Sequence, residues 1–220
     1  SMPPGTARDA LAESLAIFQL GETGDGSTLQ KWAAKESARD RALLGYPVAV
    51  KLFIKEENYH AEMLARMVQH LGGHLREKHW AAWAFNRIRK VIPCLEYEIQ
   101  ILLSAELIAR AYYALLAQQV PEPSIQACSA RLVRDEIRHI SFHAEFFRER
   151  FLTWTPSAIS LWRWQFRTLF TAATWLVWWS HRPAFQALGI SRETWATRCR
   201  ASHHDFIRQS SANTARFTAA

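Results

Sequence analysis

The chain has 220 residues, 49% of them hydrophobic and 21% charged, a composition that predicts a globular fold and excludes a disordered chain. The net charge is +7, but the basic residues form no long run, so we do not expect a nucleic-acid partner. The three cysteines, Cys94, Cys128 and Cys199, are too far apart for a zinc ribbon or a disulfide framework. No signal peptide is visible. The longest uncharged stretch, 168–180, is shorter than the roughly 20 residues of a membrane span, so we do not expect the chain to span a bilayer. The lack of a disulfide framework fits a reducing compartment, and we expect a cytoplasmic protein.

Apolar residues recur at intervals of three and four along most of the chain, which predicts helices. In chain order we expect helices at about 7–34, 52–71, 80–90, 95–119, 124–152 and 156–180, and a last one that begins near 191. Gly72 and Gly73 should stop the second of these helices. Long helices with short connections predict an all-α bundle. We assign residues 1–153 to a four-helix bundle. Residues 154–220, which hold seven of the ten tryptophans, form a helical extension packed on the same domain.

Two Glu-x-x-His pairs indicate a metal site. Glu57 with His60, and Glu136 with His139, are each spaced so that carboxylate and imidazole share one helix face. Each pair lies mid-helix in an apolar stretch, where a carboxylate is costly unless it is paired or bound to a metal. In four-helix bundles, two such pairs and one Glu from each of two other helices hold two iron or manganese ions.

Helix geometry suggests where the two further glutamates lie. Glu106 and Glu136 are equally far from the turn at Pro121, so both lie about 20 Å from it and at the same level. Glu98 lies about 12 Å off that level, and we therefore prefer Glu106. In the first helix, Glu22 and Glu36 both remain candidates, because the position of the turn before the second helix decides which of them is level with Glu57.

Three segments resemble the ferritin-like di-iron carboxylate superfamily, in its oxygenase branch. Residues 21–24, Gly-Glu-Thr-Gly, are similar to the Gly-Glu-x-Gly segment of demethoxyubiquinone hydroxylases. Residues 106–113 resemble the third-helix segment of aldehyde-deformylating oxygenases. Residues 135–139, Asp-Glu-Ile-Arg-His, are similar to the Asp-Glu-x-x-His motif of both families. The resemblance covers about residues 15–150 and implies a ferritin-like four-helix bundle.

The resemblance also implies the ligands and their roles. Glu57 and Glu136 bridge two iron ions, with manganese as the alternative metal, and Gly21 and Gly24 permit close helix packing beside the first ligand. The full set of six implied ligands is Glu22, Glu57, His60, Glu106, Glu136 and His139.

Each of four other residues near these ligands has two possible roles. Tyr113 is the candidate catalytic residue, as a hydrogen-bond partner of a ligand or an electron relay, and a plain core tyrosine is the alternative. We expect His143, one turn after His139, to be structural, with an additional metal ligand as the alternative. Asp135 and Glu56 are candidates to accept a hydrogen bond from the ligand histidines, or are simply surface acids.

The function implied is an oxidoreductase with two iron ions that activates O2 and hydroxylates or mono-oxygenates a hydrophobic small molecule, with electrons from an external donor. Iron storage or peroxide scavenging, as in ferritins and rubrerythrins, is one alternative, and hydroxylation of a modified RNA base is another. We expect the tryptophans of 154–220 to line an apolar substrate pocket or to lie at a membrane surface, while core packing or a homodimer contact is the plainer reading.

Overall fold

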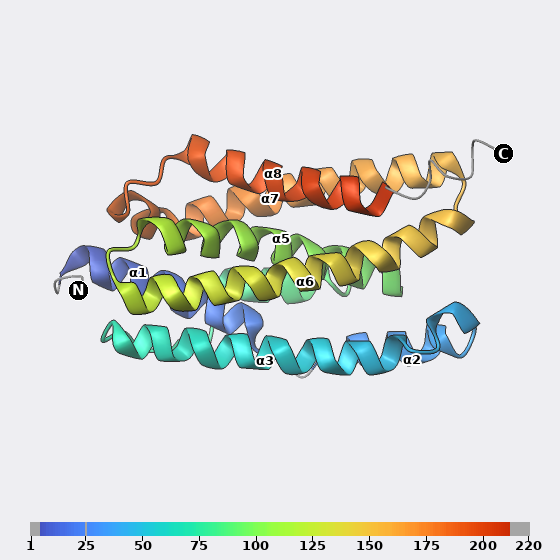
Figure 1. Cartoon of the computed structure of the whole chain (residues 1–220), viewed down its shortest axis with the longest axis horizontal. Coiled ribbons are helices and arrows are strands. Elements are labelled where there is room, and N and C mark those ends of the chain that lie inside the picture. Colours follow the sequence, from blue (N-terminus) through green and yellow to red (C-terminus); the bar gives the residue numbers. More distant parts are fainter. Residues whose placement is uncertain (1–4, 25, 212–220) are drawn as a thin grey trace. The chain divides into compact units, whose positions relative to one another are not determined.

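The computed structural model describes residues 5–24 and 26–211, and over these residues it holds helices and no strand (Figure 1). The all-α prediction is confirmed. The elements are α1 (Thr6–Glu22), α2 (Ser27–Ser37), the short 3₁₀ helix η1 (Arg41–Leu43), α3 (Tyr46–His70), α4 (Trp80–Ile88), α5 (Leu95–Gln119), α6 (Pro123–Thr153), α7 (Pro156–Ala187) and α8 (Arg192–Ser211).

Most of the expected helices are present, but the prediction of the first helix is wrong. The stretch at 7–34 forms two helices, because α1 ends at Glu22 and α2 begins at Ser27. Gly26, the residue before α2, has φ of 59°, a left-handed conformation that favours glycine. At the other end of the chain, α7 runs beyond the predicted end and continues through Pro183.

The chain divides within α5 into two compact units, 1–101 and 102–220. In the N-terminal unit, α1 and α2 both pack against α3 (Figure 1). Arg8, near the start of α1, donates hydrogen bonds to the carbonyl oxygens of Leu71 and His70 at 2.9 and 2.8 Å. These carbonyls end α3 and have no partner within the helix. The bonds therefore fix α1 antiparallel to α3.

The end of α3 is a glycine stop, as predicted. Gly72 has φ of 76°, and Gly73 donates its N–H to the carbonyl of Val68 at 2.9 Å. A Cβ at Gly73 would lie 2.6 Å from the Cβ of Ala12, so glycine is needed here for the close approach of α1.

In the C-terminal unit, an aromatic cluster joins α6, α7 and α8. Trp162 lies 4.4 Å from Phe147, 5.1 Å from Phe151 and 5.1 Å from Phe166 between ring centroids. Phe206 of α8 packs edge-on against Phe147 and Phe166. Buried aromatic rings stabilise a core through large apolar contact areas, and this cluster makes α7 and α8 integral to the unit.

One described helix, α5, is long and apolar enough to pass a test for a membrane span, with a mean hydropathy of 1.4. However, 78% of the apolar segment of α5 that passes this test is buried within the protein. The core helix of a water-soluble bundle has the same composition, so α5 by itself gives weak evidence of a membrane span.

Candidate metal centre

The C-terminal unit brings together three buried ligand-type side chains. Glu106 comes from α5, while Glu136 and His139 lie one turn apart on α6. The Nδ1 atom of His139 is 3.2 Å from Oε2 of Glu106 and 3.9 Å from Oε2 of Glu136. One ligand atom from each residue lies within 4.8 Å of the others. Two carboxylates and one imidazole at these distances can hold one divalent cation.

The short connection between α5 and α6 explains why these residues meet. α5 ends at Gln119 and α6 begins at Pro123, and Glu106 and Glu136 are equally far from the turn. At a rise of 1.5 Å per residue both lie about 20 Å along their helices. Glu98, which is buried but further from the turn, instead accepts a hydrogen bond from Nε of Arg89 at 3.0 Å.

The charges of this cluster suit a cation. Burial acts to raise the pKa of Glu106, but the side-chain interactions with Glu136 and His139 and the charges of His139 and His143 outweigh it, and the pKa is lowered. Glu106 is therefore ionised at neutral pH. His143 is fully buried, and this burial is the main cause that lowers its pKa to about 4; Glu106 acts in the opposite direction and His139 adds to the lowering.

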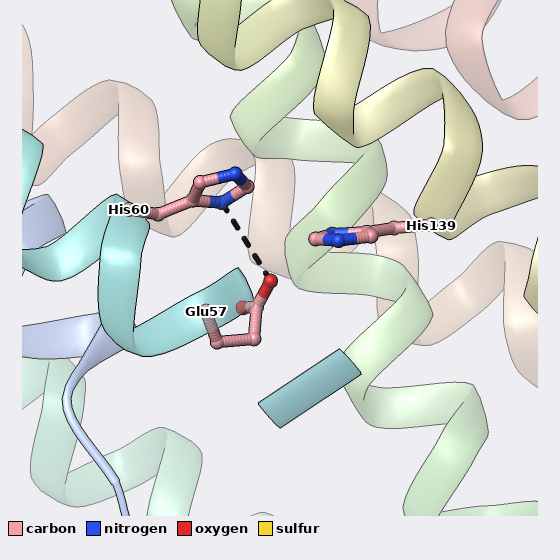
Figure 2. A group of neighbouring side chains, drawn as sticks. All are labelled: Glu57, His60 and His139. Atoms are coloured by element: carbon pink, nitrogen blue, oxygen red, sulfur yellow. Dashed lines mark ion pairs between the residues drawn. The ribbon is translucent and has the colours of Figure 1, made fainter. Parts of the chain in front are cut away.

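The N-terminal unit carries the second Glu-x-x-His pair. Figure 2 shows Glu57 and His60 on adjacent turns of α3, with the carboxylate directed toward the imidazole. Nδ1 of His60 and Oε1 of Glu57 are 3.6 Å apart. His60 is fully buried and Glu57 is half-buried. The i, i+3 spacing thus produces the convergence that the sequence predicts.

The register of α1 on α3 bears on the choice between Glu22 and Glu36. Arg8 reaches Leu71, and the two helices are antiparallel, so residues about 21 Å further along α1 and back along α3 are level. Those residues are Glu22 and Glu57. Glu36 lies at the other end of α2, where its carboxylate accepts a hydrogen bond from Arg39 at 3.1 Å. This register supports Glu22 as the ligand that accompanies Glu57.

The expected role of the neighbouring glycines is wrong. A Cβ at Gly21 or Gly24 would meet no described atom within 4 Å, so these two glycines do not serve close packing. The close approach is at Gly26, where a Cβ would clash with Cδ1 of Ile54. The sequence signal, three glycines in one short segment, could not tell which of them faces α3.

Three other expected residues are placed as follows. Tyr113 is fully buried, with its ring 5.7 Å from that of Tyr112 between centroids. Asp135 is buried and forms ion pairs with Arg131 at 2.9 Å and Arg138 at 2.8 Å. Glu56 is exposed, as a surface acid would be.

The family was identified by comparison with known proteins. A family model described as p-aminobenzoate N-oxygenase AurF matches residues 50–220. The chain belongs to the AurF family. No curated protein and no solved structure matches the chain. AurF proteins are ferritin-like di-iron oxygenases, so the resemblance to the ferritin-like di-iron superfamily is confirmed. The chain is an O2-activating enzyme of the di-iron type.

The AurF match also shows which parts of the chain belong to the family's own fold. It includes both Glu-x-x-His pairs and Glu106, whereas Glu22 and Glu36 precede it. It extends through the Trp-rich helices α7 and α8. Carboxylates and imidazoles are the ligands that iron and manganese accept, so the residues present fit the metal that the AurF family implies.

Proposed function

We propose that this AurF-family protein transfers one oxygen atom from O2 to an organic small molecule with an apolar body, and that aromatic amines are its substrate class. The observation that carries the proposal is the buried cluster of Glu106, Glu136 and His139 in a chain that matches an N-oxygenase family over residues 50–220. The substrate class is supported by the family's description, which specifies N-oxygenation of p-aminobenzoate.

The proposed ligands fall into two groups. Glu106, Glu136 and His139 hold one iron ion, and Glu57, His60 and Glu22 contribute the rest of a two-iron site. When bound, the iron pair supplies the binding and reduction of O2. Glu106 is suited to its role because its pKa is low and it needs no proton loss to bind a cation at neutral pH.

The balance of the reaction requires a reductant. One atom of O2 enters the substrate and the other leaves as water, so each turnover consumes two electrons and two protons. We infer an external electron donor that supplies them, since the three cysteines of the chain are free and scattered and no rubredoxin-type cysteine set is present to hold a further metal centre.

The test is a product assay with the full chain. Metal-free protein is loaded with Fe(II) without oxygen, mixed with p-aminobenzoate and a chemical reductant, and exposed to isotopically labelled O2. We expect a hydroxylamine or a more oxidised product that carries the label, detected by mass spectrometry. Loading with Mn(II) and the variant Glu136→Ala are the controls, and neither should yield product.

Two results would contradict this proposal. If the iron-loaded protein consumes no O2 in the presence of reductant, the proposed oxygenase function is wrong. O2 consumption without an oxygenated product from p-aminobenzoate or related aromatic amines would remove the substrate class and leave the oxygenase activity.

A further inference from the structure

The outward face of α7 is unusually apolar. Leu161, Trp164, Trp175 and Trp179 are 64%, 59%, 40% and 59% exposed, and we call these four residues the α7 stripe. Their spacings of 3, 11 and 4 residues place them on one side of the helix. The stripe extends over about 27 Å. Surface helices of water-soluble proteins normally carry charged and polar side chains on this side.

The orientation of α7 is fixed by its other face. Trp162, Phe166 and Phe170 are buried, and the first two lie in the aromatic cluster with α6 and α8. At the C-terminal end of the helix, the ring of Phe185 packs at a tilt against that of Trp195 of α8, 4.9 Å apart between centroids. The stripe is therefore held on the exposed side by the core of the C-terminal unit. Exposed large apolar side chains that gather on one helix face, here as two pairs on either side of Thr168 and Thr171, mark an interaction site.

All formally charged side chains on α7 are arginines. The helix contains neither Asp nor Glu, and of its three arginines Arg167 and Arg182 are exposed, while Arg163 is half-buried and donates a hydrogen bond to Ser211 of α8 at 2.8 Å. Arg182 lies over the ring of Trp179 at 5.7 Å, and Arg192 of α8 lies over the ring of Trp175 at 3.7 Å. Tryptophan and arginine together suit the interface of a lipid bilayer, because the indole ring partitions to the headgroup level and arginine binds lipid phosphates.

We propose that the α7 stripe binds the surface of an anionic lipid bilayer, with the helix in the plane of the interface. The charge pattern favours this occupant over a second copy of the chain, since two stripes brought together would offer arginines to each other and no carboxylate on α7 to pair with them. An uncharged apolar partner would offer the arginines no anionic group to bind. The proposal does not depend on which substrate the metal centre oxidises.

The experiment measures binding of the full chain to lipid vesicles by co-sedimentation. One set of vesicles is phosphatidylcholine alone, and the other is an equal mixture of phosphatidylcholine and phosphatidylglycerol. The test variant is Trp164→Ser with Trp179→Ser. The matched control is Trp83→Ser on α4, because Trp83 is 63% exposed and also has an arginine, Arg87, over its ring.

We expect wild type and Trp83→Ser to bind the anionic vesicles and to bind neutral ones more weakly. The double variant should bind at least about tenfold more weakly, because each tryptophan loses a large apolar contact. Arg182→Gln should weaken binding about fivefold, and added salt should weaken wild-type binding as well. Circular dichroism and melting temperature establish that each variant remains folded.

Several outcomes would overturn the proposal. These are no binding of wild type to anionic vesicles at low salt, equal binding to both vesicle types, unchanged binding of the folded double variant, or equal loss in Trp83→Ser. A wild-type dimer in sedimentation velocity that becomes monomeric in the double variant, without vesicle binding, would assign the stripe to contact between copies instead.

Discussion

His143 should make the metal-free protein less stable as the pH falls. This side chain is fully buried on α6, and its burial lowers the pKa to about 4. Histidine in an unfolded chain titrates near 6.5. Between about pH 6.5 and 4 the unfolded state therefore binds a proton on His143 that the folded state does not, and unfolding becomes more favourable. Above pH 6.5 neither state is protonated, and the effect vanishes.

The magnitude follows from the two pKa values. Lowering the pH from about 7.5 to about 5 should cost the folded state about 2 kcal/mol through His143 alone. Below about pH 4 the loss should level off at about 3.5 kcal/mol, since the two pKa values differ by about 2.5 units and one unit corresponds to about 1.4 kcal/mol. A loss of this size is a sizeable part of the total stability of an ordinary domain.

The assay is urea unfolding of the chelator-treated protein at pH 7.5 and pH 5, for wild type and for His143→Gln. Glutamine can form hydrogen bonds but does not titrate, so wild type should lose about 2 kcal/mol more than the variant between the two pH values. All other titrating groups are present in both proteins, so the contributions of the groups that do not interact with His143 cancel in the comparison. Losses equal to within about 0.5 kcal/mol would refute the reasoning, and His143→Phe provides a second non-titrating variant.

Four further outcomes are expected. Reconstitution with Fe(II) should give two metal ions per chain by mass spectrometry, and His139→Ala should give fewer; one ion or none in wild type would contradict a two-iron site. Glu22→Ala should lose one metal ion while Glu36→Ala keeps both, and the reverse pattern would show that the register of α1 on α3 is misleading. The gain in melting temperature on metal addition should shrink at pH 5, because protons compete for the ligand imidazoles, so an unchanged gain would argue against histidine ligands. Gly26→Ala should destabilise the protein by about 1–3 kcal/mol in thermal or urea unfolding, since it strains a left-handed residue and meets Ile54; unchanged stability would contradict that close contact.

Local patterns in the sequence were sufficient for much of the fold and part of the site. The predicted helix at 95–119 coincides with α5, because prolines and apolar periodicity mark its ends and its length. The two Glu-x-x-His pairs converge because an i, i+3 spacing is a property of any helix. Glu106 lies beside Glu136 and His139 because residues at equal distances from a short turn lie at the same height on the two helices that the turn joins. Each of these relations needs only neighbours in the chain.

The sequence by itself thus determined an all-α protein with two ligand pairs, and the tertiary structure decided what depends on distant partners. Arg8 on the carbonyls of His70 and Leu71 sets the register that brings Glu22 level with Glu57, and no local signal carries that information. Composition also cannot tell which tryptophans of one helix are buried and which are exposed. Trp162 is 6% exposed and Trp164 is 59% exposed, although they are two residues apart, because the packing of α6 and α8 against α7 selects the buried face.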